Sequence, residues 1–258
     1  MTALTRSDTD RLYSDFRGQL ISPGDDEYDA ARQVWNGAID RRPALIARPS
    51  GTRDVVTAVR FAREQHLPVS VRGGGHSAAG HAVADGALTL DLSGMKSILI
   101  DPAAGRAVAG PGLVWSELDA ATQAYGLATT GGVDGTTGIA GLTLGGGLGW
   151  LDRLAGLACD NLLGAEVVTA DGQVLEASTD DHSDLFWALR GGGGNFGVVT
   201  SLTYRLHPVT EVYGGLLGYT VDRATEVLQA YREIGAGAGP AARRGPAGPR
   251  PDQADVLP

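Results

Sequence analysis

Cysteine is almost absent from this chain of 258 residues, in which Cys159 is the only one. A single cysteine forms no internal disulfide bond and no cysteine-based metal cluster, and its scarcity fits a reducing compartment. Cys159 follows the apolar pair Leu157 and Ala158, which favours a role in packing.

Long apolar stretches and excess positive charge are also missing. Residues 1–17 are polar and charged, without the apolar core of a signal peptide, and no later stretch approaches the length of a membrane span. Lys and Arg number 21 against 30 Asp and Glu, which gives a formal net charge of -9. This balance disfavours a nucleic-acid binder and a polybasic membrane-surface protein. We therefore expect a soluble cytoplasmic protein without nucleic-acid or membrane partners.

Glycine, by contrast, is abundant, with 39 residues that are clustered in runs. The most informative run is Arg72-Gly73-Gly74-Gly75-His76-Ser77, which follows the apolar stretch 67–71. Glycines lack Cβ atoms, so the backbone can bring successive N–H groups close to an anion, and Arg72 adds a positive charge. Such a loop suits a pyrophosphate, and the imidazole of His76 within it indicates chemistry as well as binding.

His76 also has simpler possible roles. A lone histidine is usually a surface residue or a satisfied core residue. His81 could join it as a metal ligand, but no carboxylate or cysteine has a ligand spacing around the pair, so no metal site is expected. Ser77 could suggest Ser/His hydrolysis, but the chain has no G-x-S-x-G elbow.

Two glycine runs match a dinucleotide-binding fingerprint in the spacing of their residues, but not in the order of the strands and helices around them. Gly73-x-Gly75-x-x-Ala78 follows a predicted strand, but the next strand at residue 88 leaves no room for a crossover helix of roughly a dozen residues. Gly192-x-Gly194-x-x-Gly197 follows a helix and precedes a strand, which is the reverse of the required order. The alternative is that such glycines have a purely structural role in tight turns. Three long runs in one chain make that alternative less favourable.

The hydrophobic pattern predicts an α+β fold, because strands and helices mix without a strict βαβ alternation. Strands are expected at 44–47, 69–72, 88–92 (with alternating burial), 97–100, 106–109, 165–170, 173–177, 198–204 and 213–220. Helices are expected at 29–35, from a cap at Ser50 or Thr52 to before Pro68, and at 113–125, 185–190 and 223–234. The Asp171-Gly172 pair predicts a hairpin turn.

Taken together, five segments resemble the FAD-linked oxidases of the vanillyl-alcohol-oxidase type, particularly the berberine-bridge-enzyme-like branch. The resemblance runs from residue 41 to about residue 208 and includes several motifs in the family's order. It implies a PCMH-type FAD-binding domain at 41–211, made of two α+β subdomains of about 41–100 and 101–211. The segments are Arg41–Pro49, Pro68–Ser77, Gly145–Gly149, Asp160–Leu162 and Arg190–Val199.

The resemblance also implies site residues. The histidine of the RGGGHS loop, here His76, bonds through Nδ1 to the 8α-methyl carbon of the flavin in this family, and such a bond raises the flavin's reduction potential. Segments 131–133 and 136–141 would line the flavin and ribityl chain, and Val168 with 197–199 would supply main-chain contacts. Cofactor contacts are therefore expected from Arg72, Gly73, Gly74, Gly75, His76, Ser77, Gly132, Val133, Asp134, Thr137, Gly138, Gly141, Val168, Gly197 and Val199.

Two departures from the family pattern are readable. Relatives with two covalent flavin bonds carry a cysteine at the position of Asp134, so a single bond through His76 is expected. Residues 212–234 look like the start of a substrate domain, and the Gly-, Ala-, Pro- and Arg-rich stretch 235–258 is expected to be a disordered tail. That break in composition is what a truncation, a frameshift or a natural tail would each produce. No catalytic base is assigned, because the family carries it in the part that would follow.

The leading interpretation is the FAD-binding part of a covalent flavoprotein oxidase, which oxidises a small organic substrate such as a sugar, alcohol or alkaloid and passes electrons to dioxygen. An FAD dehydrogenase with another acceptor and a non-covalent reductase of the cell-wall-precursor type are alternatives within the fold. An inactive flavin-binding fragment is the alternative from another class.

Overall fold

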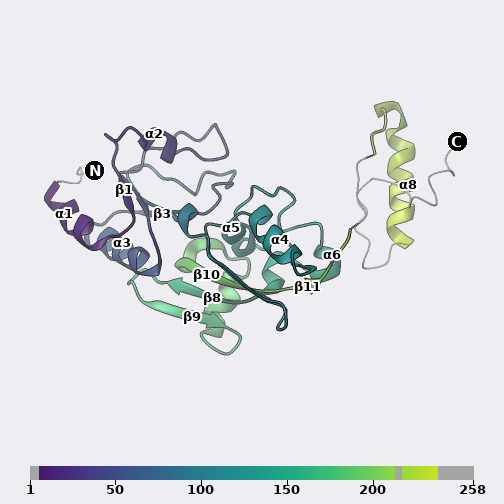
Figure 1. The fold of residues 1–258 in the computed structure, drawn as a ribbon. Coiled ribbons are helices and arrows are strands. Elements are labelled where there is room, and N and C mark those ends of the chain that lie inside the picture. Colours follow the sequence, from purple (N-terminus) through teal and green to yellow (C-terminus); the bar gives the residue numbers. More distant parts are fainter. Residues whose placement is uncertain (1–5, 213–216, 238–258) are drawn as a thin grey trace.

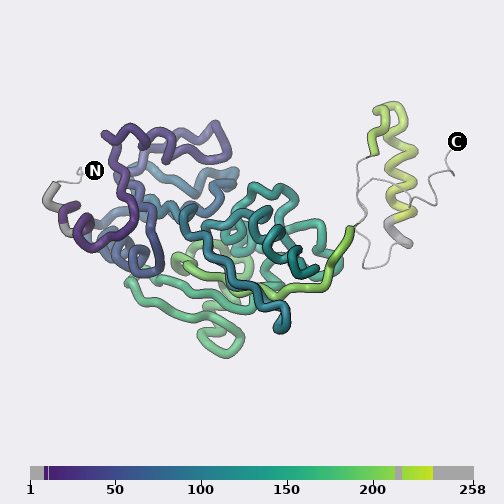
Figure 2. The backbone as a smooth tube through the Cα atoms, in the orientation of Figure 1, coloured from purple at the N-terminus to yellow at the C-terminus, as the bar shows by residue number. Residues whose placement is uncertain are grey.

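The computed structural model describes residues 6–212 and 217–237 and shows two halves, each built around a β-sheet (Figure 1). In Figure 2 the purple and blue part of the chain forms one half, and the teal and green part forms the other. The first half contains α1 (Arg6–Asp15), β1 (Gln19–Ile21), α2 (Tyr28–Ala31), β2 (Leu45–Arg48), α3 (Thr52–Glu64), β3 (Val69–Arg72), β4 (Leu88–Asp91) and the 3₁₀ turn η1 (Leu92–Gly94).

The second half and the segment after it follow in chain order. Their strands are β5 (Ile98–Asp101), β6 (Arg106–Ala109), β7 (Leu127–Ala128), β8 (Leu162–Val168), β9 (Val174–Ser178), β10 (Val198–Arg205) and β11 (His207–Pro208). Their helices are α4 (Trp115–Gln123), α5 (Ile139–Leu144), α6 (Asp152–Ala155), α7 (Ser183–Leu189) and α8 (Ala224–Gly237), with 3₁₀ turns η2 (Ala158–Asn161), η3 (Gly193–Phe196) and η4 (Val221–Arg223). Figure 1 shows α8 away from the two halves.

The first sheet has the order β1-β2-β4-β3, in which β2, β4 and β3 are parallel and β1 is antiparallel to β2. All four residues of the central strand β4 are buried, so the alternating burial expected there is wrong. The reason is that a central parallel strand is covered on both faces. Helix α3 packs the apolar residues Val55, Ala58 and Ala62 into the same core as Leu88 and Leu90 of β4.

The second sheet is antiparallel, with the order β5-β6-β10-β8-β9. Its buried side chains pack with Trp115 and Leu118 of α4, Ile139 of α5 and Leu189 of α7 in one large core. The predicted hairpin at Asp171-Gly172 is confirmed, because β8 and β9 pair directly across that turn. The small sheet of β7 and β11 lies at the end of this half.

Helix α3 connects the two halves through apolar and polar contacts. Val168 of β8 and Val198 of β10 belong to the core cluster formed by α3 and the first sheet. In addition, the Thr52 hydroxyl at the start of α3 donates a hydrogen bond of 2.6 Å to the Glu166 carboxylate on β8. The two sheets therefore share a core boundary instead of being joined by a linker alone.

Several expected elements differ in detail. The cap of α3 is Gly51, not Ser50 or Thr52, because the Asp54 carboxylate engages the backbone N–H and the hydroxyl of Ser50. Helix α5 was not expected within the glycine-rich tract, yet Ile139, Ala140 and Leu144 bury one side of it. Helix α2 is shorter than predicted. The strand expected at 213–220 lies partly outside the described residues, and residues 217–220 form no strand.

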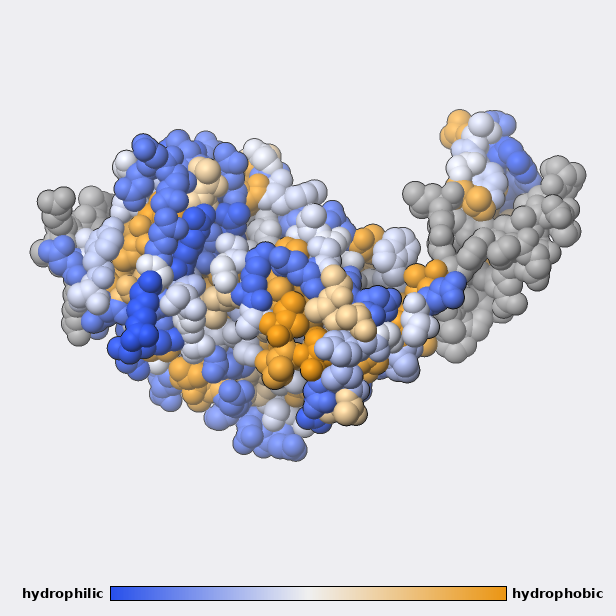
Figure 3. Space-filling view, in the orientation of Figure 1, coloured by the Kyte–Doolittle hydropathy of each residue, from blue (hydrophilic) through white to orange (hydrophobic). Residues whose placement is uncertain are grey.

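The described surface is mainly polar, as the blue and white areas of Figure 3 show, with an apolar area near the middle of the body on this face. None of the helices in residues 6–212 and 217–237 is both long and apolar enough to cross a membrane. The same residues contain no group of three or more His, Cys, Asp or Glu side chains placed to hold a metal ion.

Candidate functional site

Two glycine loops, one from each half, cross in direct backbone contact. A Cβ atom built on Gly74 would lie 2.3 Å from the backbone nitrogen of Gly138, and one built on Gly138 would lie 2.3 Å from the nitrogen of Gly74. No side chain fits between backbones that approach this closely. The crossing therefore requires glycine on both sides, and it brings the Arg72–Ser77 loop to the residues that precede α5.

The first of these loops presents unused backbone donors. Gly75 has a φ of +73°, a left-handed conformation that glycine adopts without strain. Within the described part of the chain, no acceptor takes the N–H groups of residues 74–77. Successive N–H groups without protein acceptors form a concavity that favours an anion. This observation fits the pyrophosphate of a dinucleotide cofactor.

Arg72 lies at the base of this loop, where its guanidinium is close to a buried carboxylate. The guanidinium donates a 2.6 Å hydrogen bond to the Ala31 carbonyl, and its Nε atom lies 3.9 Å from the Asp91 carboxylate. Asp91 is 1% exposed and also accepts a 2.9 Å bond from Arg48. The Nε atom of Arg72 is buried without a hydrogen-bond partner. Arg72 thus contacts the loop near Gly75 while it is anchored to the first half.

His76 is held from two directions. Its imidazole stacks on Trp35 with the ring centroids 5.4 Å apart and an angle of 20° between the planes. Its Nε2 atom lies 3.1 Å from the hydroxyl of Thr136, which donates a 2.7 Å bond to Asp134. The hydrogen bonds from the Thr136 hydroxyl and backbone N–H, together with the charge of His76, lower the pKa of the Asp134 carboxyl. The segment around Asp134 thus reaches His76 from the second half.

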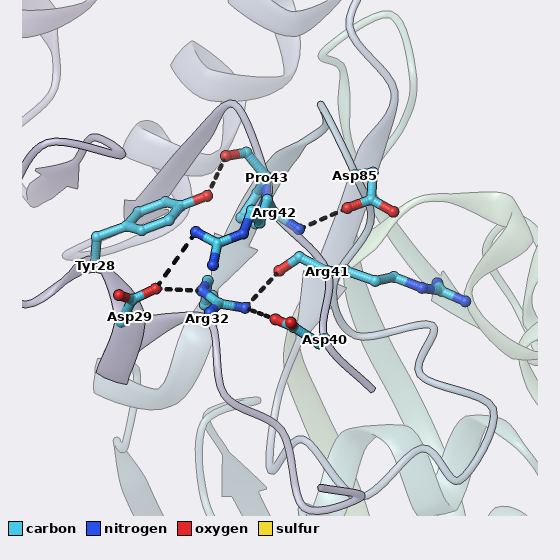
Figure 4. Close-up of polar contacts among 8 residues, drawn as sticks. All are labelled: Tyr28, Asp29, Arg32, Asp40, Arg41, Arg42, Pro43 and Asp85. Carbon is cyan, nitrogen blue, oxygen red and sulfur yellow. Dashed lines mark hydrogen bonds and ion pairs between the residues drawn. The ribbon is translucent and has the colours of Figure 1, made fainter. Parts of the chain in front are cut away.

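A polar cluster fixes the segment that carries Trp35 (Figure 4). Arg32 donates to the carboxylates of Asp29 and Asp40, and the Tyr28 hydroxyl donates a 2.7 Å bond to the Pro43 carbonyl. Arg41 points away from the cluster in Figure 4, and its guanidinium donates to the carbonyls of Gly80 and Val83, just beyond the His76 loop. The backbone N–H of Trp35 donates to the Gly75 carbonyl over 3.1 Å.

The remaining predicted residues of the two loops lie around this centre. Ser77 accepts a 3.2 Å bond from the backbone N–H of His81 through its hydroxyl. Gly132 packs against Trp115 and Leu142, while the side chain of Val133 is 58% exposed. Gly141 lies on α5 with open space beside it, since no atom comes within 4 Å of an added Cβ. The backbone carbonyl of Thr137 accepts a hydrogen bond from the backbone N–H of Trp115 and so ties the second loop to α4.

Val168, Gly197 and Val199 form another group, at the boundary of the two cores. Gly197 approaches the Val168 carbonyl so closely that a Cβ atom there would lie 2.6 Å from the oxygen. Val168 and Val199 are buried, so only their backbone groups are available to a ligand. In the described ranges no hydrogen bond joins these three residues to residues 72–77.

A hollow of about 400 Å³ lies behind Gly131 and Gly132 in the second half. Asp119 on α4 lies at its rim, in contact with water, and the apolar atoms around it raise the pKa of its carboxyl to about 6. The lining residues include Gln123, Leu127, Trp150 and Val212.

Three side chains of the site were not predicted from sequence. Trp35 lies in a weakly patterned segment, where only a short helix was expected, and no motif marks it. The contribution of Thr136 was expected only as part of a loop, not as a partner of His76. Asp119 carries no local signal. All three act through contacts between residues far apart in the chain, which a single sequence does not display.

The comparisons with known proteins agree with this geometry. The FAD binding domain family matches residues 43–178. (R)-6-Hydroxynicotine oxidase of Paenarthrobacter nicotinovorans is 44% identical over 191 residues, which are 74% of this chain and 42% of that enzyme. BBE-like 1 of Physcomitrella patens has a TM-score of 0.73 at 34% identity, over 76% of this chain and 44% of its own. For the carbohydrate oxidase of Microdochium nivale the TM-score is 0.72 at 31% identity, over 76% and 42% of the two chains.

The chain thus spans less than half the length of these three proteins. Their shared part is the PCMH-type α+β fold, and the two loops that cross at Gly74 and Gly138 lie within the matched range. The chain belongs to the FAD binding domain family, and within it to the FAD-linked oxidoreductases of the berberine-bridge-enzyme-like branch.

Proposed function

We propose that this chain holds FAD through a covalent bond from His76 Nδ1 to the 8α-methyl carbon and serves an oxidase that acts on a small organic substrate. The crossing of the loops at Gly74 and Gly138 carries the proposal, because it places His76 and the unused N–H groups of residues 74–77 beside the Gly132–Gly141 segment. The pyrophosphate and the flavin ring of FAD can then be held by adjacent parts of one site.

The residues divide the work by their chemistry. The N–H groups of Gly74 to Ser77 bind the pyrophosphate, with Gly73 and Arg72 supporting the loop from the end of β3. Gly132, Val133, Asp134, Thr137, Gly138 and Gly141 line the flavin and the ribityl chain, and the open space beside Gly141 suits a ring edge. The backbone groups of Val168, Gly197 and Val199 supply further main-chain contacts. This FAD-binding unit covers residues 41–211.

The proposed reaction follows from the chemistry of the cofactor and the activities of the relatives. When bound, FAD accepts a hydride at N5 and passes the electrons on to dioxygen, which gives hydrogen peroxide. A C–H bond beside an oxygen or a nitrogen is the proposed donor, since one relative is an oxidase of 6-hydroxynicotine and another a carbohydrate oxidase. The protein orients the ring through His76 and the two loops.

Acid precipitation of the purified chain tests the covalent bond. The wild-type pellet should stay yellow and fluoresce under near-ultraviolet light in a denaturing gel, whereas His76→Ala should release all of its flavin into the supernatant. Complete release from the wild type would contradict the covalent bond. Gly141→Ala should fold as stably as Gly24→Ala, which also has no atom within 4 Å of the new Cβ, but should bind FAD more weakly.

Assays for peroxide test the acceptor. The flavin-loaded chain, with (R)-6-hydroxynicotine and a panel of oligosaccharides as probes, should produce peroxide in proportion to substrate consumed. Reduction of an artificial dye without peroxide would instead indicate a dehydrogenase.

A further inference from the structure

A continuous hydrogen-bonded path joins His76 to a carboxylate on the other half of the molecule. The His76 Nε2 atom lies 3.1 Å from the Thr136 Oγ1 atom, which lies 2.7 Å from the Asp134 Oδ1 atom. The Thr136 N–H donates to the same carboxylate oxygen over 2.7 Å and fixes the turn. Three side chains from two loops are thus joined by consecutive hydrogen bonds.

The direction of these bonds can be deduced from the number of protons. A hydroxyl has one proton to donate, and an ionised carboxylate can only accept. The two hydrogen bonds that Thr136 donates lower the pKa of the Asp134 carboxyl, so it is ionised at neutral pH. The hydroxyl proton of Thr136 therefore lies toward Asp134, and the oxygen's lone pair faces His76. The proton of a neutral imidazole must then reside on Nε2, which leaves a lone pair on Nδ1.

The ring is also fixed in orientation. Trp35 stacks on the imidazole, and its backbone N–H donates to the Gly75 carbonyl, which ties the Trp35 segment to the histidine loop. Stacking on Trp35 holds the plane of the ring, and a 180° flip about χ2 within that plane would replace Nε2 by Cε1 and lose the bond to Thr136. Nδ1 is consequently held on the side of the ring that Thr136 does not occupy.

We propose that Thr136 and Asp134 are positioning residues for flavin attachment, because they hold His76 in the Nε2–H tautomer and so make Nδ1 the nucleophile. This inference rests on the proposed covalent bond. It also gives Asp134 a function, although a carboxylate cannot form the second flavin bond for which relatives carry cysteine at that position.

The bonds, protons and electrons that change in the attachment reaction show where these residues act. One C–H bond of the 8α-methyl group and the Nε2–H bond of His76 break, and one N–C bond forms at Nδ1. The two protons and two electrons released pass to dioxygen, which becomes hydrogen peroxide. The Nε2 proton leaves along the path to Thr136, and the exposed Asp134 carboxylate stabilises the positive charge that develops on the ring.

The rate of attachment tests the proposal. The full chain, produced as apoprotein from riboflavin-starved cells, is mixed with FAD, and the acid-stable flavin is measured over time. Thr136→Val should slow attachment by about 10²-fold, within the range for a positioned proton acceptor, while Thr136→Ser should restore most of the rate. Asp134→Asn should slow it to a smaller extent.

A matched control exists on the β8–β9 hairpin, where the Thr169 hydroxyl donates to the Asp171 carboxylate in the same local pattern. Thr169→Val and Asp171→Asn should leave the attachment rate within twofold of wild type. Equal rates for Thr136→Val and Thr169→Val would overturn the proposal.

Nitrogen NMR of the apoprotein supplies a readout that needs no flavin. With ¹⁵N-labelled histidine, the ring signals of His76 should show Nε2 protonated in the wild type and a shift toward mixed tautomers in Thr136→Val. A wild-type ring protonated on Nδ1 would overturn the proposal even if flavin attaches. If flavin never attaches but the Nε2–H tautomer is found, the proposed covalent bond is wrong, and only the assignment of the tautomer to Thr136 and Asp134 stands.

Discussion

At the scale of single residues, the absence of side-chain atoms decides where the two halves of the site can meet. Gly74 and Gly138 approach backbone to backbone, so neither neighbour can move aside by changing a rotamer. A clash with the end of a flexible side chain could relax at little cost, but a clash with a peptide nitrogen shifts a whole loop. The geometry of the site thus depends on two hydrogen atoms in place of methyl groups.

Gly74→Ala should therefore lower the free energy of unfolding by about 3 kcal/mol, the upper end for overpacking, because its Cβ would lie 2.3 Å from the Gly138 nitrogen. Urea unfolding measures the change, and FAD titration of the folded variant should show weaker binding. Gly24→Ala, with open space around its Cβ, should change stability by less than about 0.5 kcal/mol. Equal stability of the two variants would show that the loops do not cross as described.

Asp119 should make stability depend on pH. The apolar surroundings raise the pKa of its carboxyl to about 6 from its ordinary value of 3.8. The folded state then binds more protons than the unfolded state between these pH values, so this residue's contribution to stability falls as pH rises through the interval. Asp119→Asn should be more stable than wild type at pH 7.5 and equally stable at pH 4. The gain at pH 7.5 should be less than about 1 kcal/mol, because the carboxyl group contacts water. Thermal unfolding at both pH values measures the difference.

At the scale of elements, local patterns predicted those elements whose causes are local. The Asp171-Gly172 turn and the β-branched run of β10 needed no distant contact to be recognised. Helix α5 lies in a tract of glycine and threonine that disfavours helices, and it forms because Ile139 and Leu144 pack into the core of the second sheet. The same limit applies to the site: glycine runs could be read from the chain, but the stacking of Trp35 on His76 could not.

The segment that carries Trp35 should loosen when its anchor is removed. The Arg32 side chain is 13% exposed and binds the carboxylates of Asp29 and Asp40. Arg32→Met keeps the apolar stem but loses these bonds, so we expect a loss of about 1 kcal/mol in stability. Acrylamide quenching of Trp35 should also become faster, measured in a background where the exposed Trp150 and Trp187 are replaced by Phe and the buried Trp115 is kept.

Arg42→Met is the matched control, because that side chain is 64% exposed and reaches Asp29 only at 3.7 Å. It should change stability by less than about 0.5 kcal/mol and leave quenching unaltered. Similar effects of both variants would indicate that the cluster in Figure 4 does not hold the segment.

At the scale of the whole molecule, the two sheets are linked at two separate places. One is the crossing of the glycine loops, and the other is the core boundary, where Val168 and Val198 of the second sheet pack with α3. Chains of this length often unfold in several steps, since separate cores can melt independently. Here any opening of one half exposes apolar surface of the other, which favours a single step.

We therefore expect one unfolding transition, reported equally by two tryptophans. Trp35 stacks on His76 beside the first sheet, while Trp115 is fully buried against Tyr204 in the second core. In wild-type protein labelled with 5-fluorotryptophan, the separate ¹⁹F signals of native Trp35 and Trp115 should disappear at the same urea midpoint. Val198→Ala should lower both midpoints together, by about 2 kcal/mol in unfolding free energy, because it removes packing at the shared boundary. Val174→Ala, at a position 46% exposed on β9, should shift neither midpoint measurably. Two midpoints that separate in Val198→Ala would mean that the halves fold as independent units, and that only the cofactor could then hold the site together.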